Sequence, residues 1–159
     1  MKKILLISGI VCLVALTDLS AQDYKTGIGL RGSYTGGLTV KHFISSKAAL
    51  EGILGTGLRY RGSWNITGLY EWESPISDVD GLAWFVGVGG HIGHWDDNPW
   101  WSTGGPRTVI GVDGIIGLEF TIPNAPICFQ LDYKPAFNLI GYSGWWGDDL
   151  ALSIRFAIK

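Results

Sequence analysis

The chain has 159 residues, enough for one domain, and its 14 acidic and 12 basic residues give a formal net charge of −2. This balance excludes the strongly basic surface that nucleic-acid binding requires. Only 16% of the residues are charged, against about 25% in ordinary soluble proteins, whereas glycine and tryptophan are abundant, with 24 and 8 residues. This composition therefore favours a membrane-embedded β protein over a soluble one.

The first 21 residues have the order of a secretory signal peptide. Two lysines precede the apolar run Ile4–Leu16, which is too short to span a bilayer as a helix, and small and polar residues follow it. We predict cleavage after Ala21. The exported part, residues 22–159, is then expected to be a single domain.

Alternation of apolar and polar residues with a period of two recurs along this part of the chain and predicts eight antiparallel strands. Segments rich in Gly, Pro, Ser and Asn separate them, among them a predicted turn at Gly36-Gly37 and a predicted loop over Gly141–Asp149. Eight is the smallest common strand number for an outer-membrane barrel, so the predicted fold is an all-β, up-and-down transmembrane barrel. The predicted strands are, in chain order, Tyr24–Thr35, Leu38–Ser45, Ala48–Tyr60, Trp64–Glu73, Gly81–Trp95, Val109–Thr121, Ile127–Leu139 and Leu150–Ile158.

The charged residues of these strands share one face. An Arg or Lys that faces lipid at mid-depth costs about 2–4 kcal/mol, and no strand Arg or Lys falls on the apolar face. An eight-stranded barrel is just wide enough for its own side chains to fill it. We therefore predict a filled polar interior without a wide pore, held by a network of paired charges. The predicted network comprises Arg31, Lys41, Glu51, Arg59, Glu71, Glu73, Asp113, Glu119, Asp132, Lys134 and Arg155.

Aromatic residues on the apolar face fall into two groups when the direction of each strand is followed. Membrane barrels carry an aromatic girdle at each interface with water. If the first strand starts on the periplasmic side, Tyr34, Tyr60 and Trp64 form the outer girdle. The predicted periplasmic girdle comprises Tyr24, Tyr70, Trp72, Trp84, Phe120 and Phe156.

Taken as a pattern, the mature chain resembles the small outer-membrane barrels of the OmpX/OmpA-like superfamily, often described as porin-family or β-barrel-domain proteins. The segments that carry the resemblance are Gly68–Glu71, Gly111–Gly114, Leu131–Phe137 and Leu150–Phe156. The resemblance implies a monomeric barrel in the bacterial outer membrane, in contact with membrane lipid and lipopolysaccharide and inserted by the barrel-assembly machinery. Its members include adhesion, lipid-modifying and purely structural barrels, so the resemblance does not assign one activity.

Catalysis is the first alternative, because His42, His91 and His94 are the chain's three histidines and a lipid A acyl hydrolase would use a Ser/His/acid set. Strand direction places His42 toward the periplasm and His94 toward the outer rim, and no serine accompanies either on the apolar face. His94, Asp96 and Asp97 could bind a divalent cation weakly, but they are more simply read as the polar start of a loop. We therefore predict no catalytic residue, no metal and no cofactor.

Tryptophans mark two predicted outer loops, and exposed tryptophans can stack on sugars or fill a partner's pocket. The candidate contact residues are Trp95, Trp100, Trp101, Trp145 and Trp146, for which capping of the barrel mouth is the favoured role. The main functional prediction is a structural or surface-interaction barrel. A secreted lipocalin-like ligand carrier, with the two faces inverted, is the second alternative.

Overall fold

The structure is a computed structural model, and its described part includes none of the predicted signal peptide. The described residues are 24–33, 35–57, 63–95, 107–141, 144–146 and 149–158. Within them, no helix is long and apolar enough to cross a bilayer.

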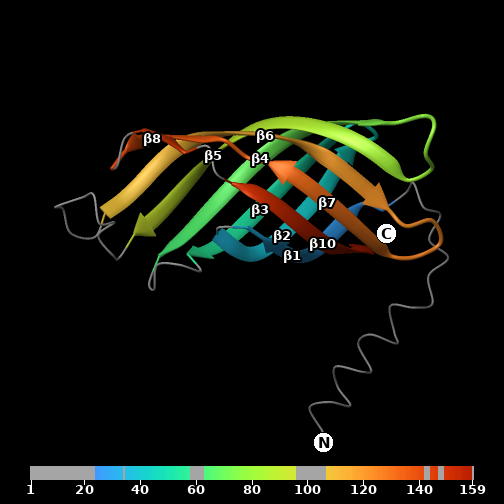
Figure 1. The fold of residues 1–159 in the computed structure, drawn as a ribbon, viewed down its shortest axis with the longest axis horizontal. Coiled ribbons are helices and arrows are strands. Elements are labelled where there is room, and N and C mark those ends of the chain that lie inside the picture. The colour runs from blue at the N-terminus through green and yellow to red at the C-terminus, as the bar shows by residue number, and fades with distance from the viewer. Residues whose placement is uncertain are drawn as a thin grey trace, which may run out of the picture.

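The described residues form one sheet of ten β-strands, which curls into a barrel (Figure 1). Each strand pairs antiparallel with its neighbours. Because apolar and polar residues alternate along the strands, one face of the sheet is apolar and the other is polar. The strands are β1 (Thr26–Gly32), β2 (Thr35–Ser45), β3 (Ala48–Gly57), β4 (Trp64–Pro75), β5 (Leu82–Trp95), β6 (Arg107–Thr121), β7 (Ile127–Tyr133), β8 (Ala136–Ile140), β9 (Gly144–Trp146) and β10 (Leu150–Ile158).

The barrel closes where β1 pairs with β10, the first described strand with the last. β7 and β8 both pair with β6 and lie end to end, so they make up the seventh strand of the barrel. β9 pairs with β8, and β10 pairs with β7, so these two make up the eighth. The prediction of an eight-stranded, antiparallel, up-and-down barrel is therefore confirmed.

Two details of the predicted strands are wrong at the end of the chain. The predicted strand Ile127–Leu139 is interrupted at Lys134 and Pro135, because proline has no N–H with which to continue the ladder. The backbone N–H of Lys134 donates instead to the carbonyl of Asp149, at 2.9 Å. The predicted loop Gly141–Asp149 also contains a strand, β9, which extends the final hairpin past the interruption.

The predicted turn at Gly36-Gly37 is also wrong, because both glycines lie within β2 and pair with β3. A Cβ at Gly37 would lie only 2.0 Å from the carbonyl oxygen of Leu54. This glycine is therefore needed for the close approach of two strands and not for a reversal of the chain. Gly81, predicted to start a strand, lies in a turn with φ +82°.

The two ends of the barrel differ. Short connections join β2 to β3, β4 to β5 and β6 to β7 at the end where β1 begins and β10 finishes, and we call this the turn end (right in Figure 1). The opposite end carries the connections β1–β2, β3–β4, β5–β6 and β8–β9, and we call it the loop end.

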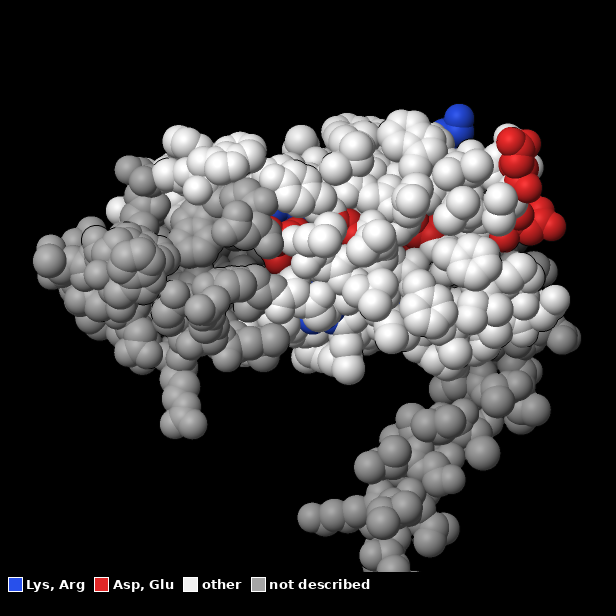
Figure 2. Space-filling model, in the orientation of Figure 1, with Lys and Arg blue, Asp and Glu red and all other residues white. Residues whose placement is uncertain are grey.

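The outer and inner faces of the wall have opposite character. Outward-facing side chains are large and apolar, with Leu30 65% exposed, Val88 56% and Ile116 53%. Inward-facing positions hold buried charged residues, such as Lys41 and Arg155, beside a small apolar cluster of Ile53, Leu69, Phe85 and Ile115. On the face shown in Figure 2 the wall is largely uncharged, and charged atoms gather at the turn end.

Glycine on the inner face lets neighbouring strands approach closely enough to close so small a barrel. A Cβ at Gly89 would lie 2.0 Å from the carbonyl oxygen of Gly68 and 2.9 Å from the Cα of Leu69, and neither backbone atom can rotate away. Gly52 has nothing within 4 Å of the same position.

We predict that Gly89→Ala lowers the free energy of unfolding by about 1–3 kcal/mol, because the added methyl group forces the two strands apart. Urea titration of the refolded barrel, followed by tryptophan fluorescence, measures this change. Gly52→Ala is the matched control and should change the midpoint little. Equal effects of the two substitutions would show that the close approach does not matter.

Candidate functional site

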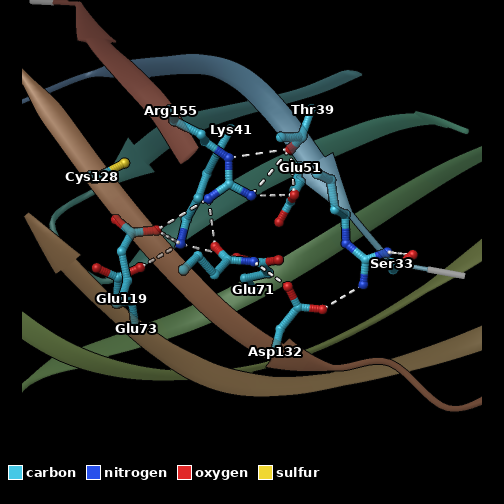
Figure 3. A network of polar contacts seen from close by, with 12 residues as sticks. Ser33, Thr39, Lys41, Glu51, Glu71, Glu73, Glu119, Cys128, Asp132 and Arg155 are labelled. Atoms are coloured by element: carbon cyan, nitrogen blue, oxygen red, sulfur yellow. Dashed lines mark hydrogen bonds and ion pairs between the residues drawn. The ribbon is translucent and has the colours of Figure 1, made fainter. Parts of the chain in front are cut away.

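The centre of the barrel is occupied by a network of polar contacts whose turn-end half is organised around Arg155 of β10 (Figure 3). The guanidinium donates to the carboxylate of Glu51 on β3 and, at 3.1 and 3.2 Å, to the hydroxyl of Thr39 on β2. Its other terminal nitrogen lies 2.6 Å from Oε1 of Gln130 and 3.4 Å from Oε2 of Glu119. Arg155 thus connects strands on opposite sides of the barrel.

Lys41 of β2 makes the second set of contacts across the lumen. Its ammonium lies 2.6 Å from Glu73, 2.9 Å from Glu119 and 3.1 Å from Glu71. The same nitrogen lies 4.6 Å from the centre of the Phe85 ring, within the range of a cation–π contact. Because β2 pairs with β1 and β3 and not with β6, the contact with Glu119 spans the interior.

A loop-end half of the network surrounds Arg31 and Lys134. Arg31 lies 2.5 Å from Asp132 and 3.0 Å from Asp149, and Lys134 lies 3.2 Å from the same Asp149 oxygen. Lys134 also contacts Asp113 at 3.1 Å. The loop-end half therefore holds together β1, β6, β7 and Asp149, the residue directly before β10.

His91 of β5 and Gln130 of β7 complete the network. The His91 ring nitrogens lie 2.8 Å from Asp113 and 2.9 Å from the side-chain oxygen of Asn138. Gln130 donates to Asp132 at 3.1 Å while it accepts from Arg155, so it joins the two halves.

The turn-end half carries more negative than positive groups. Its four carboxylates, Glu51, Glu71, Glu73 and Glu119, face two cations, Lys41 and Arg155. Glu71 is fully buried, and neither of its carboxylate oxygens has a hydrogen bond. Its Oε2 is close to the Lys41 nitrogen but not aligned with it, so this contact is an ion pair without a hydrogen bond.

Tyr24 was predicted in the periplasmic girdle, and this prediction is wrong. The residue precedes β1, so strand alternation does not apply to it, and its hydroxyl donates to Glu119 in the interior. Its ring packs edge-on against Phe43, with centroids 5.1 Å apart. Burial and the nearby charge of Glu119 raise the pKa of Tyr24 well above its ordinary value.

The structure brings the predicted network residues together, except Arg59, which lies outside the described residues. Among the predicted girdle residues, Trp64, Trp72 and Trp84 are exposed on the outer face. Tyr70 and Phe156 are half-buried, and Phe120 is 36% exposed. Tyr34 and Tyr60 lie outside the described residues.

Of the tryptophans predicted to make outer contacts, Trp145 is described fully and is 66% exposed on β9. Trp95 and Trp146 are described as strand positions only, and Trp100 and Trp101 lie outside the described residues.

The histidines considered for catalysis lie apart. His42 pairs with Thr26 near the turn end, and its Nδ1 shares a hydrogen bond with the Thr26 hydroxyl at 2.9 Å. His94 pairs with Trp64 near the loop end, and His91 lies in the interior. Asp96 and Asp97 lie outside the described residues, within which no group of three His, Cys, Asp or Glu residues is placed to hold a metal ion.

Sequence reasoning missed several members of the network. Thr39 and Gln130 lie on the polar face of their predicted strands, so the alternation could have identified them. Asn138 also lies on the polar face of its predicted strand, Ile127–Leu139, so the alternation could have identified it. Asp149 could not be found in this way, because it falls in the predicted loop Gly141–Asp149.

Arg155→Met is expected to lower the free energy of unfolding by about 3–5 kcal/mol, because it leaves Glu51 charged, buried and without its cation. Urea unfolding measures this loss. The double variant Arg155→Met/Glu51→Leu should recover part of it, since the uncompensated carboxylate is then removed as well. Lys47→Met, at an exposed turn, is the control, and an equal loss in that variant would contradict the assignment.

Asp149 lies between two cations of the loop-end half, 3.0 Å from Arg31 and 3.2 Å from Lys134. Asp149→Asn is expected to lower the free energy of unfolding by about 1–3 kcal/mol, because it takes a shared carboxylate away from both cations. Urea unfolding measures this loss, and a stability equal to that of wild type would contradict the assignment.

Comparison with known proteins gives a likeness of fold. No protein-family model matches the chain, and no curated protein matches it in sequence. Among solved structures, it is similar to the N-terminal β-barrel domain of Pseudomonas aeruginosa OprF, with a TM-score of 0.65 and 12% sequence identity. The match covers 84% of this chain and 95% of that domain. The shared feature is thus the barrel itself.

Proposed function

We propose that the protein is an integral barrel of the bacterial outer membrane with a filled interior, whose role is structural or one of surface interaction and not that of a wide pore. The observation that carries the proposal is the inverted arrangement of its two faces. Charges are buried inside, and a continuous wall of large apolar side chains is exposed outside.

This arrangement would be unfavourable in water. Removing one Leu, Ile or Phe side chain from water contributes about 1.5–3 kcal/mol, and an apolar surface extending around a monomer marks a contact with another apolar phase. Lipid chains supply such a phase on all sides of a barrel. Trp72, Trp84 and Trp64 would then lie where the wall meets the two interfaces.

The connections support one orientation in that membrane. Outer-membrane barrels have short periplasmic turns and longer external loops. The longest connection, 96–106, is at the loop end, so the loop end would face outward, and the turn end, with the connections 46–47, 76–81 and 122–126, would face the periplasm. Insertion by the barrel-assembly machinery and contact with lipopolysaccharide belong to the same proposal.

The lumen supports a role without wide conduction. Lys41 and Arg155 each contact carboxylates on opposite walls, and both side chains are fully buried. A ligand carrier of lipocalin type would instead need an apolar cavity at this position. For the surface role, Trp145 offers an exposed ring at the loop end for contact with sugar or a partner.

The lipid contact is tested by placing arginine on the outer face of β6 at two heights. Ile116→Arg, near the middle of the wall, is expected to destabilise the barrel in phospholipid vesicles by about 2–4 kcal/mol. Thr108→Arg, on the same face near the loop end, should cost about 0–1 kcal/mol. Reversible unfolding in vesicles measures both, and equal, small costs would contradict a lipid-facing wall.

Cell fractionation tests the location independently. The full chain should be recovered with outer membranes, need detergent for extraction, and migrate differently on gels before and after heating. Recovery as a water-soluble periplasmic or secreted protein would contradict the proposal. Conductance steps of porin size in planar bilayers would contradict the filled lumen alone.

A further inference from the structure

The turn end of the barrel contains a cavity of about 770 Å³, which the network above does not fill. Its volume is within the range of small-molecule sites, about 300–1,000 Å³. One wall comes from the turn that joins β4 to β5, including Ile76 and Val79, and another from the end of β2.

Two aromatic rings and a carboxylate lie together in this cavity. Tyr24 and Phe43 pack edge to face and offer ring surface, and Glu73 lies beside them. The Glu73 side chain is 14% exposed, whereas those of Glu51 and Glu71 are fully buried and that of Glu119 is 2% exposed. Glu73 is therefore the carboxylate through which the turn-end network reaches the cavity.

The charges around Glu73 favour a cation. The turn-end half, with Glu73 included, has four carboxylates for two cations, and the lining of the cavity adds one residue of each sign, Asp80 and Lys25. A positive group placed against Glu73 would reduce an excess of negative charge in a half-buried site, where such interactions are stronger than in water. An anion would meet repulsion there.

We propose that the turn-end cavity binds an organic cation, a primary ammonium or guanidinium group on an apolar stem. The charged group lies against Glu73 and donates a charge-assisted hydrogen bond to its carboxylate, and the stem lies against Tyr24 and Phe43. Such a group occurs in free polyamines and in the Lys or Arg side chains of a polypeptide.

Titration of the refolded full chain in a non-ionic detergent with pentylammonium tests the proposal, with calorimetry and NMR shifts of Phe43 and Ile76 as readouts. Saturable binding is expected, and the neutral analogue 1-pentanol and the anion pentanoate should bind much more weakly. Glu73→Gln should weaken pentylammonium binding about tenfold or more. Asp78→Asn is the matched control, because Asp78 is an exposed carboxylate of the same turn that does not line the cavity. That variant should bind like wild type.

Ala83→Phe keeps the test decisive if Glu73→Gln does not fold, because Ala83 lines the cavity and the larger side chain narrows it without changing any charge. It should weaken pentylammonium binding. Absence of saturable binding to wild type, equal binding of pentanol and pentylammonium, or equal losses in the Glu73 and Asp78 variants would each overturn the proposal.

Two further ligands distinguish the source of the cation. Tighter binding of spermidine than of an extended lysine- or arginine-containing peptide would identify a free polyamine, and the reverse would identify a polypeptide segment. These measurements are made in detergent and need no bilayer. Absence of cation binding would therefore overturn this proposal without bearing on the proposed membrane location.

Discussion

The structure depends on the compensation of buried charge across the lumen. A lone charge buried in a protein interior is strongly unfavourable, so each cation inside this barrel must have carboxylates within reach. Arg155 and Lys41 meet that condition through contacts with β3, β4 and β6, strands that do not pair with their own. These contacts fix the strands relative to one another as well as filling the space between them.

The same constraint explains the character of the wall. Side chains alternate across a strand, so a strand that places Arg155 inward must place Ile154 and Phe156 outward. The outer face is then apolar along every strand, and glycine occupies inner positions such as Gly89 where no side chain fits. A barrel built in this way has its cations paired with carboxylates inside and an apolar surface outside, which is the arrangement that a lipid environment favours.

The sequence was most informative where a period of two alone decides the outcome. The limits of β10 and the placement of Glu51, Asp113 and Asp132 on one face follow from alternation. That this face points inward followed from the cost of charged side chains facing lipid. Alternation failed where a residue leaves the strand. Tyr24 precedes β1 and points inward, and Asp149 joins the network from a segment that was predicted to be a loop. The turn-end cavity depends on how two connections and the segment before β1 come together at the barrel mouth, which is tertiary information.

The Arg155 guanidinium is held between Glu51, Thr39 and Gln130 and is shielded from water. NMR of the 15N-labelled arginine side chains in detergent micelles tests it directly. We predict separate terminal nitrogen signals for Arg155, slow exchange of its protons with water and contacts to Thr39. A single averaged signal in rapid exchange with water would show a hydrated, open lumen and would contradict the account.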